Sequence, residues 1–113
     1  MTLDEIATLC RVEYPRVVKS IFVFDPRRNR IRIELVDGSF LDIHQTSEGR
    51  YSYHWEREDG FYRFNNAPHF DHIESAPHHL HIGNERVIPS DIRGVTEDSV
   101  RKVLQFVEEH LTV

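Results

Sequence analysis

Five of the eight histidines in this chain lie in one short stretch, NNAPHFDHIESAPHHLHIG (65–83). Imidazole titrates near neutral pH, so histidines serve as general acids and bases, and the neutral ring is a common ligand of transition metals. The segment APHxxHI occurs twice here, and each copy has a proline that fixes the backbone near its start. This density of imidazoles predicts a functional site, and a plain loop is the alternative.

The second copy predicts a pair of neighbouring histidines. In HHLHI (78–82), taken as a strand, Leu80 and Ile82 lie on one face and His79 and His81 on the other. The apolar pair is expected to face the core, which leaves His79 and His81 side by side in the open. Such a pair can supply two ligands to one metal, or an acid and a base to one reaction.

The remaining histidines of the segment are expected to support this pair. Asn66 is a candidate helix N-cap and Pro68 is tolerated in a first helical turn, so we expect His69 and His72 on one side of a short turn. His78 either orients this pair or is a partly buried histidine whose ring is bonded to the backbone.

A predicted hairpin brings further polar groups to the same region. The runs YSYHWER and FYRFN flank Asp59-Gly60, a strong turn signal. A two-residue loop there places Trp55 opposite Phe64 on an aromatic face. That register also sets two polar pairs on the other face, Glu56 with Arg63 and His54 with Asn65. An ordinary solvated sheet face is the alternative.

A metal site is one interpretation of these residues. Three neutral imidazoles and a carboxylate can hold zinc or manganese. The candidate ligands all lie in the histidine-rich stretch: His69, His72, His79, His81, Asp71 and Glu74. Their spacing matches no zinc signature such as HExxH.

Metal-free cleavage of a phosphodiester is the competing interpretation. It needs a base, an acid and a cation for the charge that develops on the phosphorane oxygens. We assign these roles to His54, Arg63, His79 and His81. Supporting roles fall to His69, His78, Asn66 and Glu56. Three aromatic residues either stack on RNA bases or, more usually for such residues, fill the core: Tyr51, Tyr53 and Trp55.

Two helices are predicted at the ends of the chain. Thr2 and Glu5 form a capping-box pattern, and the helix they begin must end before Pro15. Its apolar stripe includes Cys10, expected to be a buried thiol. Thr96 is a candidate N-cap for the second helix. The apolar stripe of that helix is Val100, Val103, Leu104, Val107 and Leu111.

Strand patterns fill the chain between the helices. VVKSIFVF (17–24) is apolar on both faces, which predicts a central strand. RIRIELV (30–36) and SFLDIHQT (39–46) form a hairpin whose odd loop predicts a bulged turn. HHLHI pairs either with ERVI (85–88) or with the preceding sheet. We predict an α+β fold in a single domain, 1–113: an antiparallel sheet of about five strands with the N- and C-terminal helices packed on one face.

Composition restricts the class of protein. The formal net charge of −5 argues against broad non-specific affinity for nucleic acid, but not against a local basic site. The turn DPRRNR (25–30) is either a solvated loop, which we favour, or a contact to a phosphate or a partner. One cysteine excludes an internal disulfide. The absence of a long apolar run and of a basic leader predicts a cytoplasmic protein.

Three motifs resemble a known family. The runs YSYHWE (51–56), RFNNAPHF (63–70) and PHHLHIGNERVIPS (77–90) resemble the TumE family of toxin–antitoxin proteins, over roughly residues 17–111. The matching positions are Tyr53, His54, Trp55, Arg63, Asn66, Ala67, Pro68, His69, Pro77, His78, His79 and His81. The chain departs from the family pattern at Phe64-Asn65, where Trp-Asp is frequent, and at Phe70, where a second histidine is frequent.

The resemblance implies a small toxin encoded beside a helix-turn-helix antitoxin that neutralises it. Our first hypothesis is a toxin that acts on RNA through the histidine cluster. The second is a non-catalytic module that binds a metal or a partner and whose histidines are structural. An exposed edge strand would also allow a homodimer.

Overall fold

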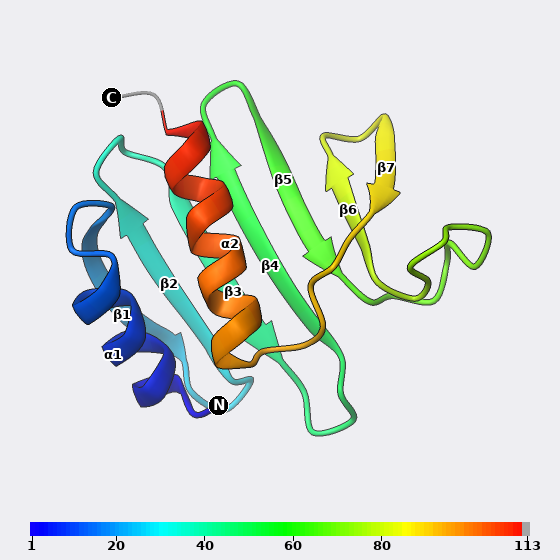
Figure 1. Cartoon of the computed structure of the whole chain (residues 1–113). Coiled ribbons are helices and arrows are strands. Elements are labelled where there is room, and N and C mark those ends of the chain that lie inside the picture. Colours follow the sequence, from blue (N-terminus) through cyan, green and yellow to red (C-terminus); the bar gives the residue numbers. More distant parts are fainter. Residues whose placement is uncertain (112–113) are drawn as a thin grey trace.

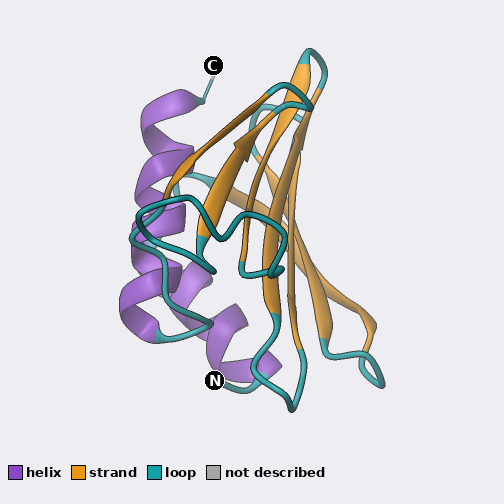
Figure 2. Ribbon diagram, turned by 90° about the vertical axis from the view of Figure 1, so that its right-hand side faces the viewer, coloured by secondary structure: helices purple, strands orange, loops and turns teal. Residues whose placement is uncertain are grey.

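A computed structural model describes residues 1–111, except for the side chains at positions 23 and 24. Its elements, in chain order, are α1 (Leu3–Glu13), β1 (Val18–Asp25), β2 (Arg30–Leu35), β3 (Phe40–Gln45), β4 (Tyr51–Arg57), β5 (Gly60–Asn65), β6 (His79–Ile82), β7 (Arg86–Pro89) and α2 (Glu97–His110). The strands form one antiparallel sheet in sequential order. Both helices lie on one face of the sheet, and the opposite face has no helix over it (Figures 1 and 2).

The α+β prediction is therefore confirmed, but the sheet has seven strands where about five were predicted. The difference arises at HHLHI, which pairs with β5 on one side and with β7 on the other. The two pairings predicted as alternatives therefore both form. A second expectation was wrong: β1 is at the edge of the sheet, not at its centre.

Both helices begin as their capping residues predict. The Thr2 hydroxyl accepts from the Glu5 amide at 3.1 Å, and the Glu5 carboxylate accepts from the Thr2 amide at 2.8 Å. The helix ends at Glu13, before Pro15. In α2, the Thr96 hydroxyl accepts from the Ser99 amide at 3.1 Å. None of the helices within residues 1–111 is long and apolar enough to cross a membrane.

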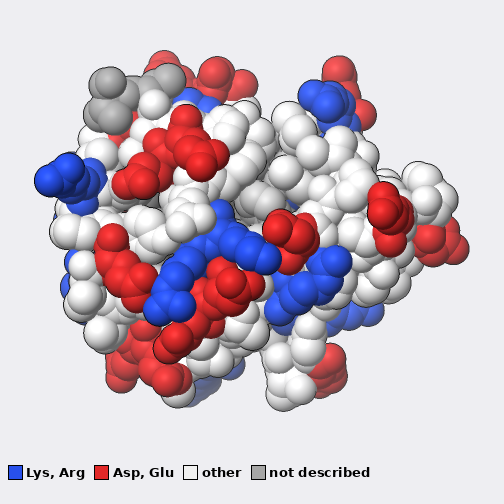
Figure 3. All heavy atoms as spheres, in the orientation of Figure 1, with Lys and Arg blue, Asp and Glu red and all other residues white. Residues whose placement is uncertain are grey.

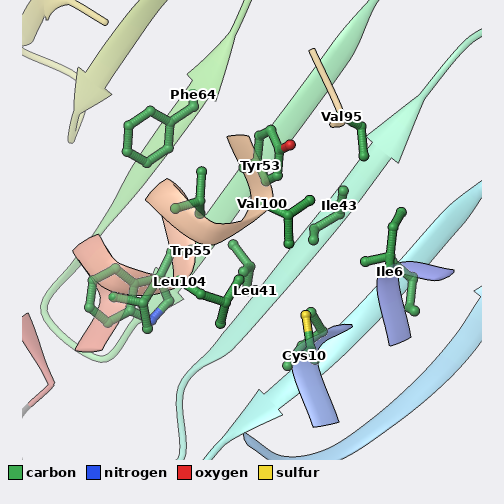
Figure 4. Close-up of a cluster of buried hydrophobic side chains, with 14 of the residues drawn as sticks. Ile6, Cys10, Leu41, Ile43, Tyr53, Trp55, Phe64, Val95, Val100 and Leu104 are labelled. Carbon is green, nitrogen blue, oxygen red and sulfur yellow. The ribbon is translucent and has the colours of Figure 1, made fainter. Parts of the chain in front are cut away.

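The core lies between the helices and the sheet (Figure 4). Trp55 of β4 is 1% exposed, packs edge-on against Phe106 of α2 and donates from its indole N–H to the Ser39 hydroxyl at 2.9 Å. Cys10 is fully buried, as predicted. On the helix-covered face, acidic and basic side chains are interspersed (Figure 3). Arg101, for example, pairs with Glu13 at 2.8 Å.

The two hairpins set the register of the sheet. Ile33 faces Leu41 across β2–β3, and Gly38 adopts a left-handed φ of 89° in a three-residue loop, which confirms the odd, bulged turn. The predicted β4–β5 register was wrong by two residues. Arg57 faces Gly60, so the loop is Glu58-Asp59.

A shift of two residues keeps every side chain of the hairpin on its predicted face but changes its neighbour. Trp55 stacks on Tyr62 at 5.5 Å instead of meeting Phe64, and Tyr62 also meets Phe106 at 5.0 Å. On the other face, His54 gains Arg63 as its cross-strand partner. In the observed register Tyr62 stacks on Trp55, Tyr62 and Phe64 both pack against Phe106 of α2, and His54 lies opposite Arg63 on the polar face.

Candidate functional site

The helix-free face of the sheet, called here the polar face, carries two rows of side chains that run across the strands from β2 to β6. The first row, named after His54, is Arg32, Asp42, His54, Arg63 and His81. The second row, named after Ser52, is Arg30, His44, Ser52, Asn65 and His79. Neighbouring strands lie about 4.8 Å apart, and two residues along a strand span about 6.6 Å. Side chains from five strands therefore share one surface.

His54 has a defined proton arrangement. The Nε of Arg63 donates to the Nδ1 of His54 at 3.0 Å, so Nδ1 is the acceptor atom of the ring. The ring proton is then on Nε2, which donates to the Glu56 carboxylate at 2.9 Å. Phe61 stacks on the imidazole at a centroid distance of 5.1 Å. Both ring nitrogens of His54 are therefore hydrogen-bonded. The two bonds, from Arg63 to His54 and from His54 to Glu56, hold the Arg63 guanidinium in place.

The rings of His79 and His81 lie next to each other, with centroids 4.8 Å apart. Their Nε2 atoms lie 3.1 Å apart, and the Nδ1 of His79 lies 2.9 Å from the carbonyl oxygen of Pro77. A carbonyl only accepts, so His79 carries a proton on Nδ1. When His79 is neutral, its Nε2 accepts, and His81 must donate from its own Nε2. The lone pair of His81 is then on Nδ1, which has no hydrogen-bond partner among residues 1–111.

The pair is side by side as predicted, but the expectation that both rings lie in the open was wrong. His79 is 1% exposed, whereas His81 is partly exposed. The ring of Phe70 packs against both, at centroid distances of 4.8 Å from His79 and 5.4 Å from His81. The loop after β5 therefore folds back over the inner histidine and leaves the outer one accessible.

The surroundings of His81 favour its neutral form. Burial lowers the pKa of His81 below its usual value of 6.5, and the neighbouring His79 and the Arg63 guanidinium lower it further. A neutral ring with an unpaired Nδ1 is a proton acceptor. His81 is thus equipped as a general base at neutral pH.

The supporting residues predicted from the sequence do not all reach this site. The Nδ1 of His78 lies 2.8 Å from the Tyr51 hydroxyl, and that hydroxyl donates to the Ile92 carbonyl at 3.0 Å. Tyr51 belongs to the core side of β4, so His78 faces away from the His79–His81 pair and is bonded to a side chain, not to the backbone as in the structural alternative. Asn66 ties two loops together by accepting from the Tyr51 amide and donating to the Gly49 carbonyl.

The metal ligands predicted from the sequence are also separated. The first APHxxHI copy forms turns and no helix, and four of the candidates are exposed there: His69, Asp71, His72 and Glu74. Within residues 1–111, no three His, Cys, Asp or Glu side chains are grouped to hold a metal ion. His79 and His81 could supply two ligands. In a tetrahedral zinc site with Zn–N bonds of about 2.0–2.1 Å, ligand atoms lie about 3.3 Å apart, close to the spacing of this pair.

A pocket of about 350 Å³ opens beside His54 on the polar face. Its lining residues are Arg30, Asp42, Ile43, His44, Ser52, His54, Arg63 and Asn65. Asp42 and His44 had no predicted role, and Arg30 was predicted only as part of the DPRRNR turn. Their signal is the alternation of polar and apolar residues in RIRIEL and in the LDIH segment of FLDIHQ. The carboxylate of Asp42 is engaged by the Nε and Nη2 of Arg32, at 2.8 and 2.9 Å.

The aromatic residues of β4 fill the core and do not flank the pocket. Tyr51, Tyr53 and Trp55 are at most 4% exposed. Base stacking by these side chains, one of the two alternatives considered, is therefore excluded. Phe61, which is partly exposed and stacks on His54, lies on the polar face in their place.

Comparison with known protein families identifies the family of this chain. The family model described as Toxin TumE matches residues 8–111, nearly the whole chain, and confirms the resemblance seen in the three motifs. No curated protein matches the chain, and no solved structure does.

Proposed function

The chain belongs to the Toxin TumE family, and from this premise we propose that it is the toxin of a toxin–antitoxin pair and that it cleaves RNA on its polar face. The observation that carries the proposal is the chain of hydrogen bonds from Pro77 through His79 to His81. This chain of hydrogen bonds keeps the Nδ1 of His81 unprotonated. His81 is partly exposed and lies opposite Arg63 across β5–β6.

His81 is the proposed general base. It removes the proton of a ribose 2′-hydroxyl at Nδ1, and its Nε2–H keeps donating to the lone pair of His79. That bond stabilises the imidazolium that forms, because the acceptor is already oriented by the Pro77 carbonyl. His79 is a positioning residue in this scheme, because its own nitrogens are both occupied.

Arg63 is the proposed cation for the reacting phosphate. Its Nε is used by His54, and its Nη groups are directed by that bond. The 2′-oxygen forms a bond to phosphorus, the bond from phosphorus to the 5′-oxygen breaks, and the leaving oxygen takes a proton from water. The hydroxide that remains takes the proton held by His81, which restores the neutral base. The guanidinium stabilises the charge on the non-bridging oxygens. His54 and Glu56 position Arg63, a change from the acid or base role first assigned to His54.

The partner proposed from the family is a helix-turn-helix antitoxin, and the proposed location is the cytoplasm, where RNA is accessible. A homodimer through the β1 edge is a further expectation. β1 is hydrogen-bonded to β2 on one side. Its other side has no strand partner within residues 1–111, so β1 is an edge strand to which a second copy of the chain could add a strand.

A second candidate function is a non-catalytic metal-binding module. It is favoured by the burial of His79, by the bond from its Nδ1 to a backbone carbonyl and by the 3.1 Å spacing of the two Nε2 atoms. A ligand histidine is usually oriented by such a bond from its second nitrogen. Zinc or manganese is the expected ion.

The experiment uses a single-stranded RNA oligonucleotide with the wild type, His81→Gln and His110→Gln. The control position His110 is exposed on α2, on the other side of the sheet. We expect a product with a 2′,3′-cyclic phosphate end from the wild type and from the control, and a loss of about 10²–10⁴-fold in kcat for His81→Gln. Equal cleavage by His81→Gln would refute the assigned base. Stoichiometric zinc binding with no cleavage would favour the second function.

A further inference from the structure

Arg30 has an unsatisfied donor beside the pocket. Its Nε is buried and has no hydrogen-bond partner among the described residues, although Arg30 lines the cavity of about 350 Å³. A guanidinium is always protonated and has donors only. Buried donors are nearly always paired in folded proteins, so each exception calls for an explanation. The Nε atom itself is shielded from solvent, but Arg30 as a residue lines the cavity. The matching partner of a permanently charged side chain at a cavity wall is an anion.

The other lining residues are suited to the same partner. His44 faces Arg30 across β2–β3. Its pKa is lowered, first by burial and then by the charge of Arg30. Arg63 closes the opposite side, and Ser52 supplies a hydroxyl. The single carboxylate among the lining residues is Asp42, and both its oxygens accept from Arg32. The lining residues therefore present cations and neutral donors without a competing free carboxylate. Asp25, which faces Arg30 across β1–β2, is not among them.

We propose that this pocket binds a phosphate group of the RNA strand, held by Arg30, His44 and Ser52. The proposal rests on the proposed function and deepens it. The pocket adjoins the His54 row, and the Ser52 row lies about 6.6 Å away along the strands, a displacement on the scale of one nucleotide. The bound phosphate is the neighbour of the one that Arg63 holds, and it fixes the register of the strand.

A polynucleotide explains a second feature that a free anion does not. A further hollow of about 430 Å³ shares His44 with the pocket and continues to Arg27 and Arg28 in the β1–β2 turn. Glu48 is the carboxylate among its lining residues, and Arg28 keeps a loose pair with Asp25 at 3.7 Å. The arginines of the DPRRNR turn thus lie along a line that starts at the pocket. A chain of phosphates can follow that line.

The first test uses inorganic phosphate as the probe and the His44 imidazole as the reporter in NMR titrations. Wild type, Arg30→Gln and Arg16→Gln are compared; Arg16 is an exposed arginine after α1 and serves as the charge-matched control. We expect phosphate to raise the pKa of His44 in the wild type and the control. We expect at least tenfold weaker binding in Arg30→Gln.

Unchanged phosphate binding in Arg30→Gln, or no response of His44 in the wild type, would overturn the proposal. Arg30→Lys is included in case Arg30→Gln does not fold, because it keeps the charge and an alkyl chain but lacks the guanidinium group. We expect its affinity for phosphate to lie between those of wild type and Arg30→Gln. Wild-type affinity in Arg30→Lys would show that the guanidinium of Arg30 is not used and would also overturn the proposal.

The second test distinguishes RNA from free phosphate. A short RNA with 2′-deoxyribose at the cleaved position competes with inorganic phosphate, again with His44 as the reporter. Displacement of phosphate by the RNA would support the RNA strand as the ligand. The Arg27→Gln/Arg28→Gln variant should then bind RNA more weakly but bind phosphate as the wild type does. Phosphate binding that the RNA does not displace would overturn this assignment. Phosphate and RNA binding without any cleavage would instead contradict only the proposed function.

Discussion

His79 and His81 face each other through their Nε2 atoms at 3.1 Å, and the carbonyl of Pro77 sets the direction of the bond between them. A backbone acceptor beyond the buried ring holds the proton on Nδ1 of His79, which obliges His81 to donate from Nε2 and to keep its lone pair on Nδ1.

The stability of the fold is expected to depend on pH through three histidines. Burial is the largest cause that lowers the pKa of His44, His78 and His81 below the usual 6.5. The unfolded chain therefore binds more protons than the folded one below about pH 6.5. We expect the free energy of unfolding to fall as the pH drops through and below that value, and to level off above it. Urea unfolding between pH 4.5 and 8 measures this, and a stability that rises on acidification would contradict the assignment.

The roles of His54 and His81 are expected to differ in the pH profile of RNA cleavage. His54→Ala releases Arg63 from its orienting bond, so we expect kcat to fall about 10–100-fold without a change in the shape of the profile. In the wild type, kcat is expected to rise with pH through a pKa below 6.5, since His81 must be neutral to act as a base.

The acidic limb of that profile should disappear in His81→Gln. A profile that loses its acidic limb in His54→Ala instead would show that His54, and not His81, is the titrating group. Glu56→Gln provides a milder control, because its amide oxygen can still accept from the Nε2 of His54.

Substitution of Phe70 is expected to create a zinc site. The Phe70 ring lies 4.8 Å from the His79 ring and 5.4 Å from the His81 ring, so Phe70→His brings a third imidazole to a pair with near-tetrahedral spacing. We expect calorimetry to give one zinc per chain, bound at least tenfold more tightly than by the wild type. Phe70→Leu is the matched control, and equal zinc affinity in Phe70→His and Phe70→Leu would contradict the prediction.

Cys10 is expected to be unreactive in the folded protein. It is fully buried, and burial raises the pKa of its thiol to about 12. Because the thiolate is the reactive species, labelling by a thiol reagent should proceed only as fast as the protein unfolds. Spectroscopic labelling rates at increasing urea concentrations check this, and fast labelling without urea would show that α1 separates from the sheet.

The sequence alone determined what depends on local interactions. The capping residues Thr2 and Thr96 placed both helices, because a cap is satisfied within four residues. The alternation in HHLHI placed His79 and His81 on one face, because successive side chains of a strand point to opposite sides. Three local motifs were likewise enough to predict the family.

Only the tertiary structure decided the features that depend on contacts between distant elements. In the observed β4–β5 register Trp55 stacks on Tyr62 and both pack against Phe106 of α2, long-range contacts that a local turn signal cannot report. The burial of His79 depended on where the loop containing Phe70 folds. The pocket at Arg30 and His44 exists because separate hairpins align side chains from different strands in one surface. Alternation specifies the face of each residue, but the neighbour across the sheet follows from register, which the whole core selects.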